Sequence, residues 1–364
     1  MTARSSIRRF DYKPLDIALH TPFGISGGAQ ARANNVLVTL ELDGGFVGYG
    51  EAAPLPPYNG ETQAQALAAL GAAQGWLVGK PADDWRALAE EFRTRGGVAC
   101  GSAQCAFEMA LLDALNRRDG VPMWKFFGGT GTTLETDMTV TTGSPEQAAI
   151  DARAIRDRRI RMIKVKVGGS KGPAYDLARL AAIRDVAPDS PLILDGNAGV
   201  SRADATALVQ GLRQLGITPA LLEQWLPKDD LAGLKALGEE SGWLVAADES
   251  VCSGADAQKI ADAKAAQVLN IKLMKAGLAT ALDIAAVAKR TGLGLMIGGN
   301  LESILAMTVS ACFAAGQGGF TFADLDTPLF MATNPFDGGF LLDGGKISVA
   351  HIKLGHGTVP KVES

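Results

Sequence analysis

The 364-residue sequence predicts an α/β protein: a (β/α)7β TIM-like barrel with an α+β capping domain that the N-terminal region and the C-terminal tail form together. Between residues 131 and 326, short apolar runs alternate with amphipathic stretches, which is typical of parallel strands joined by helices. Before this region strands and helices are segregated, and after it the chain is glycine-rich and strand-like. We therefore predict a capping domain over 1–130, a barrel over 131–326, and a C-terminal segment over 327–364 that packs back on the capping domain.

The capping domain is predicted to open with strands over 6–16, 35–42 and 46–53, the last two joined by the hairpin signal Asp43-Gly44-Gly45. Helices are then predicted over 61–79, 83–94 and 102–120, because apolar residues recur there at spacings of three and four. Strands followed by separate helices indicate an α+β unit.

The barrel strands are predicted at eight apolar runs, each followed by a helix-like stretch except the last. These runs are TDMTVT, MIKVKV, PLILD, PALLEQ, WLVAADE, AQVLNIKL, LGLMIGG and FTFADLD. An open doubly wound sheet is the alternative, but no GxGxxG or GxxxxGK[ST] motif follows any run, and VGGSKG after the second run matches only weakly. The pattern favours the barrel.

Composition narrows the classes of partner and compartment. The net charge of −4 comes from interspersed signs, which argues against nucleic acid and membrane partners. The first residues lack the apolar core of a signal peptide, and the four cysteines lack CxxC spacing, so we expect a cytoplasmic protein with reduced thiols. No histidine lies between residues 21 and 350, so histidine is excluded as the acid or base of a barrel site.

Three carboxylates stand at the ends of successive predicted strands. They are Asp195, Glu223 and Asp248, each one βα unit from the next. Because the carboxyl ends of barrel strands form one face, these side chains are expected to converge. Converging carboxylates repel one another unless a cation lies among them, and an all-oxygen set suits Mg²⁺, whereas zinc or copper would prefer His or Cys.

Lysines flank these carboxylates on both sides in the sequence. Lys164 and Lys166 share one face of the preceding strand because side chains alternate, and Lys272 ends a later strand. Across a barrel, one lysine could remove a substrate proton and another could return it to the opposite face, which describes a racemase or epimerase. A proton α to a carboxylate is weakly acidic, so the enediolate needs a Lewis acid such as Mg²⁺, while Lys164 is expected to stay cationic and bind a carboxylate oxygen.

Together these motifs resemble the enolase superfamily, specifically the muconate-lactonizing-enzyme subgroup and its dipeptide epimerases of the L-Ala-D/L-Glu epimerase type. The resemblance covers essentially the whole chain and is carried by FEMALLDALNRRDGVPMWKFFGG, the IKVKV lysine pair, DGN at 195–197, LLEQ, ADES, NIKLMKAG and DLD at 324–326. A Lys or His base combined with Mg²⁺ is the recognised device of that superfamily.

The resemblance implies a role for each matching position. It makes Asp195, Glu223 and Asp248 the ligands of one Mg²⁺ per subunit and makes Lys166 and Lys272 the two catalytic acid/base residues. The remaining positions are implied to bind substrate: Lys164 at the carboxylate, Asp324 and Asp326 at the α-ammonium of a dipeptide, and Thr139 and Asn300 elsewhere on it.

Two positions depart from the family pattern. Members that act on L-Ala-D/L-Glu usually carry an arginine in the loop after the first strand, whereas this chain has Gly27 and Gly28 there, with Arg32 as the nearest candidate. Asn300 stands where an apolar residue such as Met is expected. Both differences put an acidic dipeptide in doubt.

The leading hypothesis is a Mg²⁺-dependent dipeptide epimerase that inverts the α-carbon of the C-terminal residue of an L-Ala-X-type dipeptide by two-base proton transfer through an enediolate. Its setting would be peptide metabolism, including cell-wall peptide recycling, and we expect a homo-oligomer. Alternatives within the subgroup are an N-acylamino-acid racemase, an o-succinylbenzoate synthase or a cycloisomerase. A remote alternative is a barrel without activity that serves as a binding protein.

Overall fold

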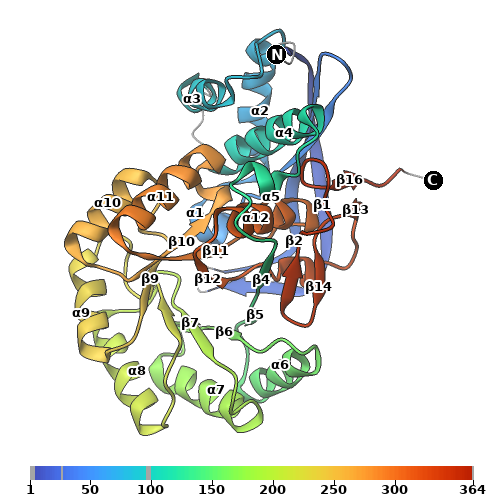
Figure 1. The fold of residues 1–364 in the computed structure, drawn as a ribbon. Coiled ribbons are helices and arrows are strands. Elements are labelled where there is room, and N and C mark those ends of the chain that lie inside the picture. The colour runs from blue at the N-terminus through green and yellow to red at the C-terminus, as the bar shows by residue number, and fades with distance from the viewer. Residues whose placement is uncertain (1–4, 26–27, 96–99, 363–364) are drawn as a thin grey trace.

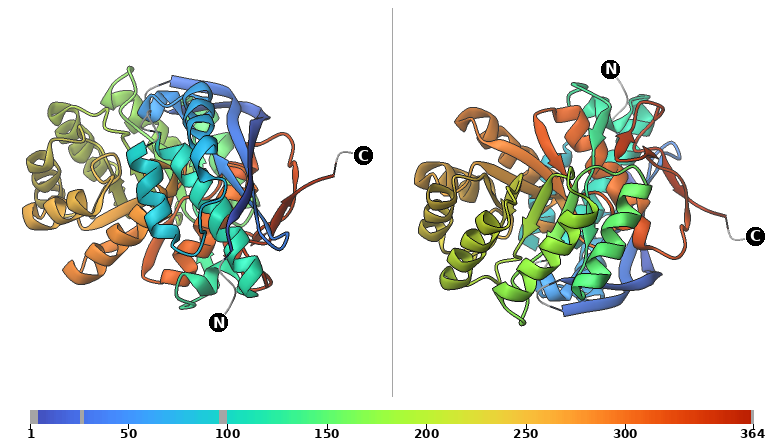
Figure 2. Two further views of the ribbon diagram at one scale, coloured as in Figure 1. Left: turned by 90° about the horizontal axis from the view of Figure 1, so that it is seen from above. Right: turned by 90° about the horizontal axis from the view of Figure 1, so that it is seen from below.

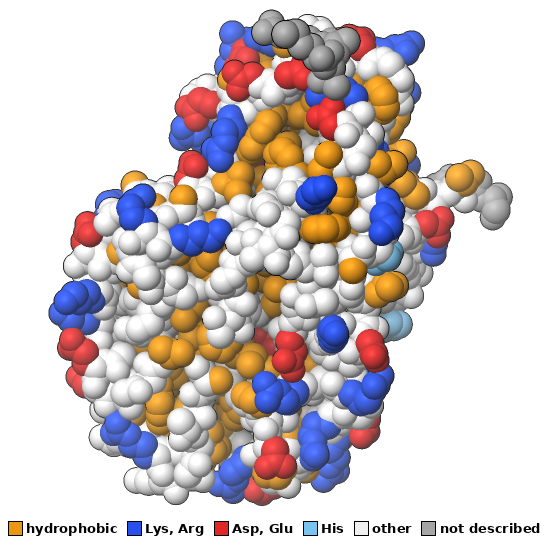
Figure 3. Space-filling model, viewed as in Figure 1, with side chains coloured by type: hydrophobic (Ala, Val, Ile, Leu, Met, Phe, Trp, Pro, Cys, Tyr) orange, Lys and Arg blue, Asp and Glu red, His pale blue; other side chains and the backbone are white. Residues whose placement is uncertain are grey.

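The structure is a computed structural model that describes residues 5–25, 28–95 and 100–362. Figure 1 shows a curled parallel sheet ringed by helices, with a second unit of antiparallel strands and helices packed beside it. No helix in these described ranges is long and apolar enough to cross a membrane. On the face drawn in Figure 3, Lys and Arg side chains lie interspersed with Asp and Glu.

The parallel sheet contains eight strands in the sequential order β12-β11-β10-β9-β8-β7-β6-β5. Across the two ends of this order, the Asp137 N–H donates to the Ala323 carbonyl at 2.9 Å, so one backbone hydrogen bond links β5 to β12. The strands are β5 (Met138–Val140), β6 (Ile163–Lys166), β7 (Leu192–Asp195), β8 (Leu221–Glu223), β9 (Val245–Ala247), β10 (Val268–Lys272), β11 (Gly294–Gly298) and β12 (Phe320–Ala323). All eight runs predicted as strands form this sheet.

A helix follows each barrel strand except the last, so the predicted (β/α)7β order is confirmed. Figure 2 shows these helices around the outside of the curled sheet. Several begin where serine caps them: Ser144, Ser201 and Ser253 accept the N–H groups of Gln147, Asp204 and Asp256. The helices are α6 (Pro145–Asp157), α7 (Pro173–Val186), α8 (Arg202–Gln214), α9 (Leu231–Ser241), α10 (Gly254–Ala263), α11 (Gly277–Thr291) and α12 (Ile304–Gln317).

The inside of the barrel is layered because side chains alternate along each strand. One layer is a separate apolar cluster of Ile193, Leu221, Ala246, Val268, Met296 and Phe322. Two residues further along these strands, toward their carboxyl ends, come Asp195, Glu223, Asp248, Asn270, Gly298 and Asp324. The apolar layer closes one end of the lumen and leaves the polar layer to form a site.

The capping unit is built on the antiparallel sheet β1 (Ile7–Ile25), β2 (Gly28–Leu42) and β3 (Val47–Ala52). Residues 20–25 and 28–35, expected to belong to a loop, instead extend β1 and β2, because Phe23 and Gly24 pair with Gln30 and Ala29. Gly27 lies outside the described residues, and Arg32 is exposed. The helices are α1 (Pro56–Asn59), α2 (Gln63–Leu77), α3 (Trp85–Arg95), α4 (Gly101–Asp119) and α5 (Met123–Phe126).

Helix α4 is the core of the capping unit and packs directly on β3. A Cβ atom at Gly48 or Gly50 would lie 2.1 Å from the Ala110 carbonyl or 2.0 Å from the Ala106 carbonyl. Only glycine therefore allows this approach of strand and helix. At the start of α4, the Glu61 carboxylate accepts the N–H groups of Gly101 (2.7 Å) and Ser102 (3.2 Å), which satisfies free donors of the first turn.

The tail after β12 contains η2 (Thr327–Phe330), β13 (Phe336–Gly338), β14 (Leu341–Asp343), β15 (Lys346–Ser348) and β16 (Thr358–Pro360). Its strand β15 pairs with β4 (Thr133–Glu135), and the Gly355 carbonyl accepts the Met123 N–H at 2.7 Å. The His356 N–H donates to Asp113 of α4 at 3.0 Å. The contacts of Gly355 and His356 join the tail to the capping unit, whereas β4 lies within the range predicted for the barrel, so the division at residues 130 and 326 stays a prediction.

Candidate active site

The two lysine-bearing strands β6 and β10 stand opposite each other in the ring. Three strands, β7, β8 and β9, separate them in the order of the eight-stranded sheet. Those intervening strands carry Asp195 and Glu223 at their last residues and Asp248 directly after Ala247. The three carboxylates thus lie along the half-circle between Lys166 and Lys272.

Lys164 is fully buried and lies among several carboxylates. Its Nζ atom is 2.7 Å from Asp324 Oδ2, 2.8 Å from Glu223 Oε2 and 3.0 Å from Asp195 Oδ2. Burial alone would lower the pKa of Lys164, but these carboxylates raise it well above its ordinary value. Lys164 is therefore a fixed positive charge, as the sequence led us to expect.

Lys166 lies at the carboxyl end of β6, with its Nζ atom 2.6 Å from Asp195 Oδ2. Arg179 of α7 supports this strand end, since Nη1 donates to the Lys166 carbonyl at 2.6 Å and Nη2 to the Thr141 carbonyl at 2.8 Å. Both Lys166 and Arg179 are nearly inaccessible to solvent. The backbone that carries Lys166 is thus held by a buried guanidinium.

Lys272 lies at the end of β10, with its Nζ atom 2.8 Å from Asp248 Oδ2. The Lys275 Nζ atom lies 2.9 Å from Asp248 Oδ1. Burial would raise the pKa of Asp248, but Lys272 and Lys275 hold it at about 2. Tyr58 of α1 covers Lys272, with the ammonium 4.2 Å from the ring centroid, and its hydroxyl donates to Asp248 Oδ1 at 3.1 Å. The capping unit therefore contributes a side chain to the site.

The predicted metal ligands fit a hard cation by their chemistry. Every candidate donor is oxygen, and beside the three predicted ligands Glu249 Oε2 and Asn197 Oδ1 are buried acceptors without a hydrogen bond. Burial and the neighbouring Asp195 raise the pKa of Glu223 to about 7, and burial and Asp248 raise that of Glu249 to about 8. A cation among these oxygens would stabilise the charged forms of Glu223 and Glu249 and so lower both pKa values.

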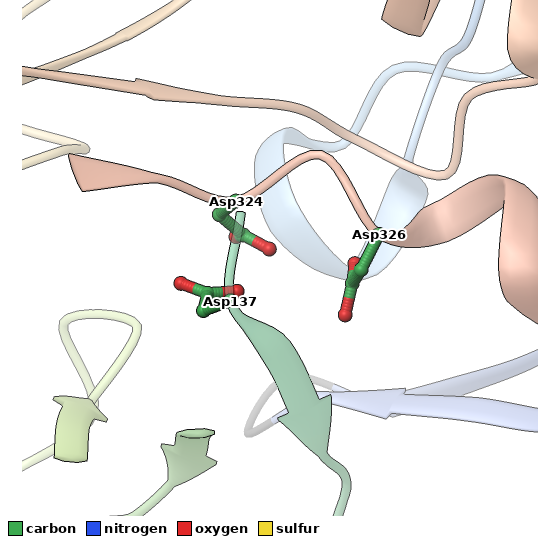
Figure 4. Close-up of side chains that lie close together, drawn as sticks. All are labelled: Asp137, Asp324 and Asp326. Atoms are coloured by element: carbon green, nitrogen blue, oxygen red, sulfur yellow. The ribbon is translucent and has the colours of Figure 1, made fainter. Parts of the chain in front are cut away.

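The predicted ligands are not, however, the tightest carboxylate group in the structure. Among the described residues, one carboxylate oxygen from each of Asp137, Asp324 and Asp326 lies within 4.8 Å of the other two (Figure 4). The Lys164 ammonium instead contacts both Asp195 and Glu223, and the Lys272 ammonium contacts Asp248. A metal ion bound there would take over carboxylate oxygens that these lysines now contact.

Asp324 and Asp326 follow β12, at the edge of the sheet next to β5. Burial would raise the pKa of Asp324, but Lys164 and Lys166 hold it below its ordinary value, whereas burial and Asp324 raise that of Asp326 to about 7. The Thr139 N–H donates to Asp326 Oδ2 at 2.7 Å. The predicted substrate residues Thr139, Asp324 and Asp326 are thus neighbours.

Asn300 follows β11 and is buried. Its Nδ2 donates to the Ala53 carbonyl of the capping unit at 2.9 Å, which leaves its Oδ1 as a buried acceptor without a partner. Because the Ala53 carbonyl can only accept a hydrogen bond, it fixes the Asn300 amide with Nδ2 toward Ala53 and Oδ1 free.

A narrow pocket joins these parts of the site. From the barrel it is lined by Thr139, Lys166, Asn197, Lys272, Gly299, Asn300, Asp324 and Thr327, and from the capping unit by Phe23, Leu55 and Tyr58. Phe23 and Leu55 belong to a small apolar cluster between the two units. The pocket therefore places apolar capping residues against the charged groups of the barrel.

Several residues of the site were not predicted from the sequence: Tyr58, Phe23, Leu55, Arg179, Lys275 and Asp137. The first three come from the capping unit, whose approach to the barrel no local pattern encodes. Asp137 could have been found, since it lies two residues before Thr139 and alternation places both on one face.

Comparison with known proteins gives matches over the whole chain. Residues 147–364 match the family model described as enolase C-terminal domain-like, and residues 12–128 match the N-terminal domain of mandelate racemase / muconate lactonizing enzyme. The aromatic dipeptide epimerase of Herpetosiphon aurantiacus is 48% identical over 97% of this chain and 98% of its own length. The hydrophobic dipeptide epimerase of Citrifermentans bemidjiense is 37% identical over 94% and 95%, and the L-Ala-D/L-Glu epimerase of Thermotoga maritima 33% over 96% and 98%.

Solved structures agree with these matches. The substrate-liganded L-Ala-D/L-Glu epimerase from Bacillus subtilis aligns with a TM-score of 0.93 and 33% identity over 98% of this chain and 100% of that one. The dipeptide epimerase from Enterococcus faecalis, complexed with Mg and L-Leu-L-Tyr, aligns with a TM-score of 0.92 and 29% identity over 97% and 99%.

Proposed function

The chain belongs to the enolase superfamily, within its mandelate racemase and muconate lactonizing enzyme group, and is an isomerase of the dipeptide epimerase type; from this premise we propose that it is a Mg²⁺-dependent epimerase of dipeptides with an apolar C-terminal residue. The observation that carries the proposal is the position of Lys166 and Lys272 on opposite strands of the ring, with three carboxylates on the strands between them.

In the proposed reaction, Lys166 and Lys272 move protons on opposite faces of the substrate α-carbon. One lysine removes the α-proton while the other, as an ammonium, delivers a proton from the opposite side, which inverts the centre. Lys164, a buried and permanently charged group, would bind a carboxylate oxygen of the substrate. Asp324 and Asp326 would bind the free α-ammonium, and Thr139 and Asn300 would contact the rest of the dipeptide.

Asp195, Glu223 and Asp248 would hold the Mg²⁺. When bound, the ion supplies Lewis acidity for the negative charge that develops on the substrate carboxylate. The all-oxygen donor set and the buried Glu249 Oε2 and Asn197 Oδ1, which lack hydrogen bonds, support this assignment. Tyr58 would remain next to Asp248 and exclude water from Lys272.

An apolar C-terminal residue is favoured by the pocket and by the relatives. Phe23 and Leu55 line the pocket beside Tyr58, whereas Arg32 is exposed and is not among the residues that line the pocket. Relatives at 48% and 37% identity are named aromatic and hydrophobic dipeptide epimerases. We include one Mg²⁺ per subunit, a homo-oligomer in the cytoplasm, and a role in peptide metabolism such as cell-wall peptide recycling in the same proposal.

The test is deuterium incorporation measured by mass spectrometry for a panel of L-Ala-X dipeptides in D₂O with Mg²⁺. We expect incorporation at one α-carbon, fastest for X = Phe, Tyr or Leu and slow for X = Glu. Fastest exchange with X = Glu would refute the apolar preference, and no exchange with any dipeptide would refute the function. N-acetyl amino acids in the same panel test the N-acylamino-acid racemase alternative, which requires no free ammonium.

A further inference from the structure

Asp137 is a buried carboxyl group to which the sequence assigned no role. Its side chain is inaccessible to solvent, and neither Oδ1 nor Oδ2 makes a hydrogen bond. Burial and the neighbouring Asp324 raise its pKa well above the ordinary value. Burying a carboxyl group without a hydrogen-bond partner costs free energy, so a bound ligand that supplies the missing donor would explain why Asp137 is there.

The surroundings of Asp137 are acidic. Figure 4 shows its carboxyl group at the start of β5, close to those of Asp324 and Asp326 from the segment after β12. Ligand oxygens of the three residues lie within 4.8 Å of one another. Asp326 Oδ1 also lacks a partner, while the second oxygen of Asp326 is taken by the Thr139 N–H and Asp324 Oδ2 by Lys164.

The charge of this cluster is incompletely balanced. Lys164 is its contacting cation, and the same ammonium is shared with Asp195 and Glu223. Another positive group fits between the three carboxylates on electrostatic grounds. The pocket reaches the cluster, because Thr139 and Asp324 line it.

We propose that Asp137 is the third carboxylate of a tripod, with Asp324 and Asp326, that binds the primary ammonium group at the N-terminus of the dipeptide. This inference rests on the proposed function and extends it to a residue outside the predicted site. Three acceptors that each lie about 2.8 Å from a tetrahedral ammonium nitrogen are about 4.6 Å apart, which falls within the 4.8 Å that separates the oxygens of the cluster at most.

A primary ammonium suits the cluster better than a divalent metal ion. It carries three N–H donors, one for each carboxylate, and a single charge. An N-acyl group, which is neutral and has a single N–H, would leave Asp137 without its partner.

The test pairs a protein change with a ligand change. Wild-type and Asp137→Asn proteins are assayed with L-Ala-L-Phe and with propionyl-L-Phe, which has the same shape but no amino group. Loss of one charge-assisted contact predicts that Asp137→Asn raises KM for the dipeptide about 10- to 100-fold and leaves KM for the propionyl compound within about twofold. Equal effects on the two ligands, or an unchanged KM for the dipeptide, would overturn the proposal.

Glu108→Gln is the matched control, because Glu108 is likewise a buried carboxyl group with a raised pKa. It belongs to α4 and contacts the start of α11, outside the Asp137 cluster. Its effect should be the same for both ligands. If wild-type protein inverts neither compound, the comparison is made by equilibrium binding of both ligands, and the dipeptide panel decides the proposed function separately. In that case, a wild-type preference for the free ammonium that Asp137→Asn abolishes supports the tripod, and no such preference refutes it.

Discussion

Glu108 joins the capping unit to the barrel, and its replacement by Gln should change how stability depends on pH. The carboxylate of this α4 residue accepts the Ala279 N–H at 2.8 Å and the Gln104 Nε2 at 2.8 Å, and a Cβ at Gly277 would lie 2.6 Å from Glu108 Oε1. Burial raises the pKa of Glu108 from 4.5 to about 7. The helix start that it contacts follows the segment carrying Lys272.

The size of the effect follows from the two pKa values. Below pH 4.5 the folded and unfolded chains both hold the proton, and the raised pKa has no cost. Between pH 4.5 and 7 the unfolded chain releases the proton while the folded chain keeps it, so stability falls as pH rises. A shift from 4.5 to about 7 amounts to about 3 kcal/mol, and this full cost is present above pH 7.

A glutamine side chain cannot ionise, so the free energy of unfolding of Glu108→Gln relative to wild type should rise by about 3 kcal/mol between about pH 4.5 and 8. Urea unfolding of both proteins across this range, followed by circular dichroism, measures the difference. Glu239→Gln, at an exposed position of α9, is the matched control and should track wild type at every pH. A difference between Glu108→Gln and wild type that stays constant with pH would refute the reasoning.

Three further predictions concern catalysis. Lys166→Ala and Lys272→Ala should each abolish epimerisation, measured by chiral chromatography of the product, and turnover retained by either variant contradicts the two-base mechanism. Treatment with EDTA should abolish turnover and added Mg²⁺ should restore it; turnover that survives complete metal removal rules out the metal requirement. Arg179→Met should lower kcat about 10- to 100-fold with little change in KM, because the Lys166 and Thr141 carbonyls lose their donor. Steady-state kinetics measures this change, and Arg179→Lys should restore part of kcat. An unchanged kcat in Arg179→Met would contradict this positioning role.

The barrel and its ring of charged residues could be predicted from local patterns. Apolar runs separated by amphipathic stretches identify parallel βα units, and such units bring the carboxyl ends of their strands to one face. Alternation then puts Lys164 and Lys166 inside the barrel, and one unit of spacing brings Asp195, Glu223 and Asp248 next to them. The roles of these residues as ligands, bases and substrate contacts stay predictions until the variants are measured.

Other parts of the prediction failed or were absent for a physical reason. The segment around Phe23 was expected to be a loop because its glycines and polar residues obscure the alternation, yet pairing with β2 makes it a strand. Tyr58 and Leu55 reach the pocket only because the capping unit packs over the barrel. Such contacts join residues far apart along the chain, 190 positions in the case of Tyr58 and Asp248, beyond the range of any periodicity.

By itself the sequence determined the barrel, the order of its strands and the charged residues that point into the lumen, because strand alternation and the βα repeat act over short distances along the chain. The tertiary structure alone decided which carboxylates each lysine contacts, which capping residues close the pocket, and that Asp137 lies beside Asp324 and Asp326. The capping contacts depend on how the two units pack, and the position of Asp137 depends on closure of the sheet, since β5 and β12 meet only when the ring is complete.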